Sequence, residues 1–148
     1  MIVYLDSSSL LKLYLADEAG GDEVRQVLAM ADTAATSSVA YTEARSTFAR
    51  RRRERKLSHE LFRIIRSEFD ADWPHYFAVE PTAGLFNEAG ELAEKYRLRA
   101  LDAIHLASFV AVARAIGSPE VEFSSFDSRL NRAAASALRS IKRVRKLP

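Results

Sequence analysis

The chain has 148 residues, a net charge of +2 and no cysteine, and these numbers limit both its fold and its chemistry. The length suits a single domain over residues 1–148, and the lack of cysteine excludes disulfides, zinc–thiolate sites and cysteine nucleophiles. No apolar run approaches the roughly 20 residues that cross a bilayer, and Asp6 and Lys12 interrupt the apolar start. We therefore expect a cytoplasmic protein without membrane contact.

Strands and helices are predicted to alternate in the first half of the chain. Residues 2–5 form a short apolar, β-branched run, and an amphipathic helix follows to residue 15. Asp22 can cap a second helix, which ends at about residue 31. The next expected elements are a strand over 34–39, a helix over 40–56, and an amphipathic helix that Ser58 caps and that runs to residue 73.

The same alternation is predicted in the second half. The expected elements are a strand over 76–79, a helix over 85–96, an almost wholly apolar helix over 100–116, a strand over 121–124, a helix over 127–138 and a last strand over 141–144. Since no two strands are joined by a tight hairpin, the pattern predicts an α/β fold with a mostly parallel central sheet flanked by helices. Functional groups in such sheets collect at the carboxyl ends of the strands.

Positive charge is concentrated in two segments. Residues 43–56 hold seven Lys/Arg against two Glu, and residues 139–146 hold five Lys/Arg and no acid. Basic patches on an otherwise acidic chain suit contact with a polyanion around an acidic centre. The tail over 139–146 is one candidate for phosphate contacts, and the others are Arg50, Arg51, Arg52 and Arg53. Two alternatives stay open: these basic segments could equally meet a partner protein or a second subunit, or the arginines could only form the solvated end of a helix.

Four acidic residues are expected to meet at the carboxyl edge of the sheet. Asp6 and Asp127 each follow a strand, and each alone is also a good helix N-cap. Glu43 and Asp102 are expected in the first turns of helices, where the helix dipole favours a carboxylate. Asp102 opens a nearly all-apolar helix, where a carboxylate needs a positively charged partner. That partner is either a neighbouring arginine, Arg97 or Arg99, or a bound cation.

Converging carboxylates repel one another, and this repulsion suggests a metal site. The usual remedy is a hard cation such as Mg²⁺ or Mn²⁺, which prefers oxygen ligands. Such ions activate water and neutralise the charge that develops on a phosphoryl group. The four acids together therefore point to metal-assisted phosphoryl chemistry.

The same residues resemble the motifs of the PIN-domain nucleases, and among these the VapC-type toxins of toxin–antitoxin pairs. Tyr4-Leu5-Asp6-Ser7-Ser8 is similar to the first acidic motif, and Ser38 followed by Glu43 resembles the second. The segment LRALDAIHLA over 98–107 is similar to the third and most distinctive motif, and SFDSRL over 125–130 resembles the fourth. Order, spacing and length agree over essentially the whole chain.

This resemblance implies a PIN-like domain that is a metal-dependent endoribonuclease and hydrolyses RNA with metal-activated water. The implied catalytic residues and ligands for Mg²⁺ or Mn²⁺ are Asp6, Glu43, Asp102 and Asp127. The hydroxyl of Ser8 would support Asp6 and its metal, and Asn131 stands where some relatives carry a further acid. The resemblance also implies an antitoxin protein that blocks the site, and we expect a homodimer.

Two other functions, a phosphatase and an inactive binding module, fit these residues less well. A phosphatase would also place an aspartate after the first strand, but it needs a second one two residues later, where this chain has Ser8. A catalytically inactive RNA- or partner-binding module of the same fold is the main alternative, although an electrostatic RNA binder gains nothing from four acids in its cleft. The histidines lack ligand spacing, so we interpret His59, His75 and His105 as surface or packing residues. His105, one turn beyond Asp102, is the only one near the proposed site, where it would at most support the ligands.

Overall fold

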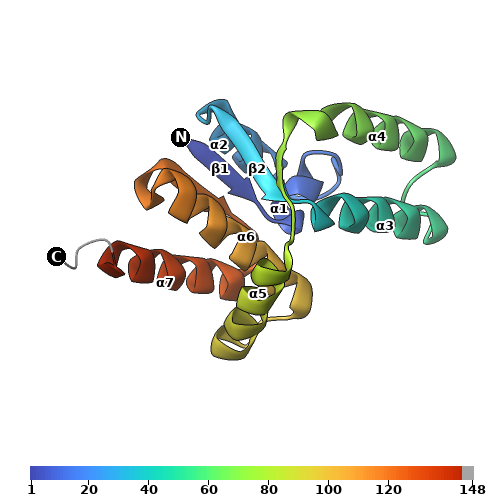
Figure 1. Cartoon of the computed structure of the whole chain (residues 1–148). Helices are drawn as coiled ribbons and strands as arrows, with labels where there is room; N and C mark the ends of the chain where they lie inside the picture. The colour runs from blue at the N-terminus through green and yellow to red at the C-terminus, as the bar shows by residue number, and fades with distance from the viewer. Residues whose placement is uncertain (145–148) are drawn as a thin grey trace.

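Four short parallel strands form the centre of the fold, in the order β3-β2-β1-β4 (Figure 1). The structure is a computed structural model that describes residues 1–144, without the side chains of residues 118 and 142–144. The strands are β1 (Ile2–Leu5), β2 (Thr33–Ser37), β3 (Phe77–Val79) and β4 (Val121–Ser124). In the register of this sheet, Tyr4 of β1 lies opposite Ala35 on one side and Phe123 on the other. The predicted α/β fold with a parallel sheet is confirmed.

Seven helices surround this sheet in the described part of the chain. They are α1 (Ser7–Lys12), α2 (Gly21–Ala29), α3 (Val39–Arg53), α4 (His59–Asp72), α5 (Ala83–Tyr96), α6 (Ala100–Ile116) and α7 (Ser128–Val144), with short 3-10 turns at Trp73–His75 and Ser118–Glu120. Ser58 caps α4 as predicted, because its side chain accepts a hydrogen bond from the amide of Leu61. Gly117, with φ at 104°, ends α6. None of the helices in residues 1–144 is long and apolar enough to cross a membrane.

The sheet separates two hydrophobic layers, as the alternation of side chains along β1 requires. Val3 and Leu5 point into a cluster that includes Phe48 of α3 and Phe69 of α4. On the opposite face, Tyr4 packs in a second cluster whose other large members are Leu106, Phe109 and Leu130 of α6 and α7. Burial of each such side chain contributes roughly 1.5–3 kcal/mol to stability. Together the two layers hold the ends of β1 and β4 in place.

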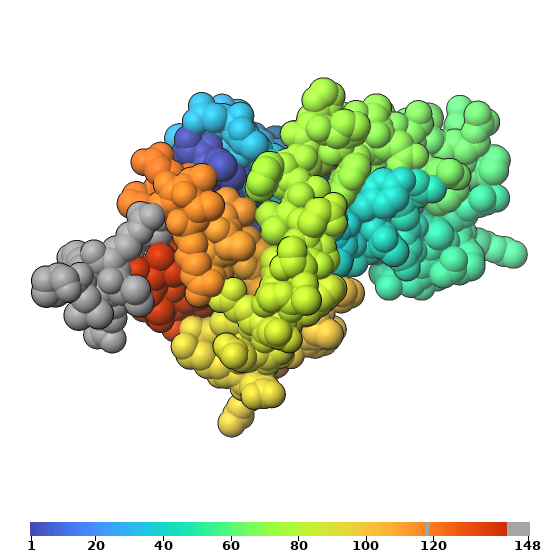
Figure 2. All heavy atoms as spheres, viewed as in Figure 1, coloured from blue at the N-terminus to red at the C-terminus, as the bar shows by residue number. Residues whose placement is uncertain are grey.

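Helices α3 and α4 form an arm that extends beyond the rest of the molecule (Figure 2). Aromatic rings hold the arm together: Phe48 and Phe69 meet edge to face at 5.6 Å between ring centres, and Tyr41 stacks on Phe69 at 5.5 Å. The amino-terminal end of α3 starts at the carboxyl end of β2, whereas its basic end lies out on the arm. The helix therefore connects the sheet edge with a distant surface.

Several predicted bounds differ from the structure by a few residues, and three further predictions about the elements are wrong. The last strand over 141–144 does not form, because these residues continue α7, whose apolar stripe from Ala133 to Ile141 packs in the layer with α6. Asp22 is not the cap of α2, since Gly20 precedes the helix with φ at 101° and Asp22 lies in its first turn. Glu43 lies one residue further along its helix than expected, just past the first turn, because α3 already begins at Val39.

Candidate active site

Asp6 is fixed at the carboxyl end of β1 by three hydrogen bonds. Its Oδ1 accepts from the amide of Ser9 at 2.9 Å and from the hydroxyl of Ser8 at 2.7 Å, and its Oδ2 accepts from Ser125 Oγ at 2.6 Å. The residue is only 4% exposed. Asp6 therefore caps α1 and is also presented at the edge of the sheet. A carboxylate offers about four lone-pair positions, so three bonds leave one for another ligand.

Asp127 is held next to Asp6 by Ser125. The hydroxyl of Ser125 donates to Asp6 and accepts from the amide of Asp127 at 3.0 Å. Asp127 Oδ1 in turn accepts from the amide of Leu130 at 2.8 Å, as an N-cap of α7 does. Ser8 Oγ accepts from the amide of Phe126 at 2.9 Å and so joins the loop after β4 to the start of α1. Sequence reasoning missed Ser125, although it lies within the motif around Asp127.

Asp102 lies half-buried in the first turn of α6, facing the other two aspartates. Burial raises the pKa of the Asp102 carboxyl, and the negative charges of Asp127 and Asp6 raise it further. Arg97 and Arg99 form no ion pair with it, nor with any other residue that the structure describes. The salt-bridge interpretation of Asp102 is therefore not supported by the geometry.

Glu43 is held beside these aspartates by two hydrogen-bond donors. Its Oε2 accepts from His105 Nε2 at 2.8 Å and from the hydroxyl of Ser7. Burial by itself would raise the pKa of Glu43, but the bonds from His105 and Ser7 outweigh it and hold the pKa below its usual range. Oε1 accepts no hydrogen bond from the described residues. Glu43 is thus a fixed carboxylate with one oxygen available.

His105 is buried beside Glu43, in the supporting position that the sequence had left open for it. The ring is 2% exposed and lies between Tyr4, Ser7 and Glu43. Burial raises the pKa of the Tyr4 phenol well above its usual range, so the phenol keeps its proton and donates to Nδ1 at 3.1 Å. Nε2 then carries the ring proton and donates to Glu43. The i, i+3 spacing from Asp102 is the signal in the sequence that could have placed His105 on the same helix face.

The predicted acids thus meet at one edge as two neighbouring groups. Asp6, Asp102 and Asp127 form one, and Glu43 with His105 forms the other. Within residues 1–144, no three Asp, Glu or His side chains are close enough to make a preassembled metal site. The donor set nevertheless suits a hard divalent cation, because it consists of carboxylate oxygens. The pKa of Asp102 is raised first by burial and then by the charges of Asp127 and Asp6.

The predicted basic patch on α3 lies about two to three helical turns from Glu43. At a helical rise of 1.5 Å per residue, the run 50–53 is about 10–15 Å along the axis from Glu43. Arg51 is only 15% exposed and pairs with Asp17 at 2.7 Å and with Glu18 at 2.6 Å. It is therefore committed to the fold. The second predicted patch, over 139–146, falls mostly outside the described side chains.

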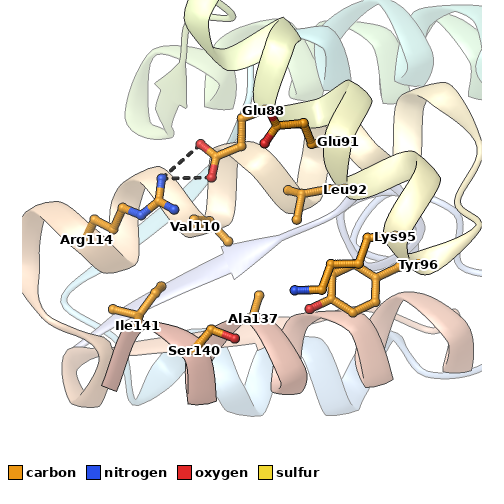
Figure 3. A pocket seen from close by; sticks show the side chains of 10 residues that line it. All are labelled: Glu88, Glu91, Leu92, Lys95, Tyr96, Val110, Arg114, Ala137, Ser140 and Ile141. Carbon is orange, nitrogen blue, oxygen red and sulfur yellow. Dashed lines mark hydrogen bonds and ion pairs between the residues drawn. The ribbon is translucent and has the colours of Figure 1, made fainter. Parts of the chain in front are cut away.

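A hollow of about 450 Å³ between α5, α6 and α7 is separate from this site (Figure 3). Leu92, Val110 and Ile141 form part of its apolar lining, and Glu88 pairs with Arg114 at 2.8 Å beside it. None of the four acids lines it. The chemistry predicted from the sequence therefore belongs to the sheet edge and not to this hollow.

The sequence matches the PIN domain family over residues 3–136. Two proteins of Mycobacterium tuberculosis, ribonuclease VapC45 and ribonuclease VapC49, are each 34% identical to this chain over 140 residues, which is 92% of this chain and 91% of each relative. The chain belongs to the VapC ribonucleases of the PIN-domain family. The predicted resemblance to this family is therefore confirmed.

Solved structures of other VapC proteins share this fold. The Mycobacterium tuberculosis toxin VapC20, described as cleaving the sarcin–ricin loop, matches with a TM-score of 0.62 at 18% identity, over 88% of this chain and 94% of that one. VapBC2 from Rickettsia felis, bound to a DNA fragment from its promoter, matches with a TM-score of 0.62 at 14% identity, over 90% and 93% of the two chains. At such identities the likeness concerns the fold.

Proposed function

We propose that this VapC-type endoribonuclease hydrolyses RNA phosphodiesters with water activated by Mg²⁺ or Mn²⁺ at the acidic edge of the sheet. The proposed ligands and catalytic residues are Asp6, Glu43, Asp102 and Asp127. When bound, the cation would supply an activated water and neutralise charge on the phosphate under attack. No covalent enzyme intermediate is required.

The observation that carries this proposal is the environment of Asp102. Burial and two neighbouring carboxylates raise its pKa, so the protein maintains an unfavourable cluster of like charges. A cation bound among these carboxylates would offset this cost. An inactive binding module has no use for such a cluster, since RNA is itself an anion.

The remaining polar residues of the site orient the acids. Ser8 and Ser125 hold both oxygens of Asp6, so that its free lone pair has a defined direction. Ser7 and His105 hold Oε2 of Glu43 and leave Oε1 for the ion. Such outer contacts fix the geometry of metal ligands, and their loss usually weakens metal binding by about 10- to 100-fold.

The partners follow from the same family. We propose that this chain is the toxin of a type II pair, that a cognate antitoxin covers the acidic edge, and that the enzyme acts on cellular RNA in the cytoplasm as a homodimer. The likeness to VapBC2 of Rickettsia felis is the comparison that supports an antitoxin partner. Arg50, Arg52 and Arg53 are proposed to contact only distant parts of the RNA.

The test is an RNA cleavage assay with purified variants. Asp6→Asn and Asp102→Asn should each lose nearly all cleavage of a structured RNA in Mg²⁺ or Mn²⁺ and keep the circular dichroism spectrum of the wild type, because an amide is a poor metal ligand of the same size. Asp22→Asn, at an exposed aspartate away from the site, is the matched control and should cleave normally. Normal cleavage by folded Asp102→Asn would contradict the proposal, and RNA binding without products by the wild type would favour the inactive module.

A further inference from the structure

A basic surface begins directly beside the acidic cluster. A hollow of about 250 Å³ has acids and arginines in one lining: Arg99, Asp102, Asp127, Ser128, Arg129 and Arg132. A second hollow, of about 340 Å³, is lined by Tyr96, Arg97, Arg129, Arg132 and Ala133. Because Arg129 and Arg132 line both hollows, the two form one continuous surface. We call it the arginine surface and define it by Arg97, Arg99, Arg129 and Arg132.

The four guanidinium groups of this surface have no ionic partner in the part of the chain that the structure describes. Arg45, Arg51 and Arg114 are each in an ion pair with a carboxylate, whereas the members of the arginine surface are in none. The one hydrogen bond that any of their side chains donates runs from Arg129 to the carbonyl of Arg97, at 3.2 Å. All four residues are exposed. Their positive charge is therefore not used to stabilise the described fold.

The chemistry of this surface suits phosphate groups. A guanidinium presents a planar fork of N–H donors that matches two phosphate oxygens. Arg99 is the N-cap of α6, and Arg129 lies in the first turn of α7, so the partial positive charge of two helix starts adds to that of the side chains. The arginines also offset the repulsion that the acid cluster exerts on an approaching polyanion.

We propose that the arginine surface binds RNA through the phosphates that neighbour the cleaved phosphate on the same strand. The proposal rests on the function proposed above and names the residues that hold the substrate. A phosphate that reaches Asp102 and Asp127 occupies the hollow that these acids share with three of the arginines. The neighbouring phosphates of the same strand then lie over Arg129 and Arg132, and the strand continues toward Arg97. RNA is favoured over an acidic protein segment because the proposed reaction itself brings an RNA phosphate to this hollow.

The test measures RNA binding without cleavage. Arg129→Ala/Arg132→Ala is compared with Arg63→Ala/Arg66→Ala, which removes two exposed arginines at the same i, i+3 spacing from α4. The probe is a fluorescein-labelled 12-nucleotide single strand of mixed sequence, in chelator, at several salt concentrations. The first pair should weaken binding at least tenfold, and it should reduce the slope of log affinity against log salt by about 1.4, since each lost phosphate contact on a single strand accounts for about 0.7. The α4 pair should match the wild type.

Three outcomes overturn the proposal. The two double variants have the same RNA affinity and salt slope as the wild type, or both lose RNA affinity equally. In the third, Arg129→Ala/Arg132→Ala loses binding of a labelled hexaglutamate peptide but keeps binding of RNA. The last outcome would assign the surface to an acidic protein. A parallel cleavage assay in Mn²⁺ separates this proposal from the proposed function. If the wild type cleaves and Arg129→Ala/Arg132→Ala cleaves with the same KM, the function stands and the arginine surface does not. If the wild type binds RNA through this surface but never cleaves it, the arginine surface stands and the proposed function does not.

Discussion

His105 donates a hydrogen bond from Nε2 to Oε2 of Glu43 across 2.8 Å, and this bond connects the two halves of the acidic edge. Glu43 belongs to α3, and His105 lies on α6 one turn after Asp102. The other ring nitrogen accepts from the buried phenol of Tyr4 on β1. A single imidazole thus fixes a carboxylate of one helix relative to an aspartate of another.

Removal of this imidazole should weaken metal binding. We expect His105→Ala to lower Mn²⁺ affinity, measured by titration calorimetry without RNA, by about 10- to 100-fold, as for other outer contacts of metal ligands. His105→Gln, whose amide can still donate to Glu43, should recover part of the affinity. Tyr4→Phe should have a smaller effect, because it removes only the outer hydrogen bond. If His105→Ala loses stability but binds Mn²⁺ like the wild type, the histidine serves only the fold.

Asp102→Asn should stabilise the metal-free protein at neutral pH. The pKa of Asp102 is raised by burial and by the charges of Asp127 and Asp6, so the folded state binds a proton more tightly than the unfolded one. The stability that protonation supplies is complete below the unfolded value of 3.8 and is lost as the pH rises through the folded value. In chelator at pH 7 we therefore expect a gain on the order of 1 kcal/mol in chemical unfolding, reduced by solvent screening. A variant less stable than the wild type at pH 7 would make Asp102 a structural residue.

Glu43→Gln should have the opposite effect on stability. The pKa of Glu43 is held below its usual range although burial opposes this, because His105 and Ser7 donate to the carboxylate. The resulting stability is present above the unfolded value of 4.5 and is lost as the pH falls through the folded value. We expect a loss of about 1 kcal/mol at pH 7 in chelator. The loss should vanish in acid, and a pH-independent difference would show that packing, not charge, is involved.

Arg51 should matter for stability, unlike its neighbours. Its guanidinium connects α3 to Asp17 and Glu18 in the segment after α1. We expect Arg51→Gln to lower the free energy of unfolding by about 1–2 kcal/mol, since hydrogen bonds to charged groups are lost. Arg53→Gln is the matched control at an exposed position and should change it by less than about 0.5 kcal/mol. Equal melting temperatures for the two variants would contradict a structural role, and Arg51 would again be a candidate for RNA contact.

Local patterns were sufficient to predict most of the fold. The apolar runs that become β1 and β4 and the long apolar helix before Gly117 are visible in the sequence, and the structure has all three with the predicted bounds. The strand predicted over residues 141–144 is wrong for a physical reason. Short β-branched segments favour a strand locally, but here the stripe that packs with α6 keeps them helical.

Contacts between residues distant in sequence explain what could not be predicted. The acids could be placed because each follows a strand or opens a helix, and parallel strands end at one edge. The partners of His105 lie 62, 98 and 101 residues away, so its spacing from Asp102 alone could not assign its role. Likewise Arg51 looks like one member of a charge run, and only the fold brings Asp17 to it.

The central claim is that four carboxylates hold the cation that drives RNA hydrolysis, and the most direct test is the rate of cleavage as a function of Mn²⁺ concentration. The measurement uses a labelled RNA under single-turnover conditions with the wild type and Asp102→Asn. We predict no cleavage in chelator, a saturating rise for the wild type, and for Asp102→Asn a curve displaced to much higher Mn²⁺ or absent. Cleavage that persists in chelator, or superimposable curves for the two proteins, would contradict the assignment of these acids.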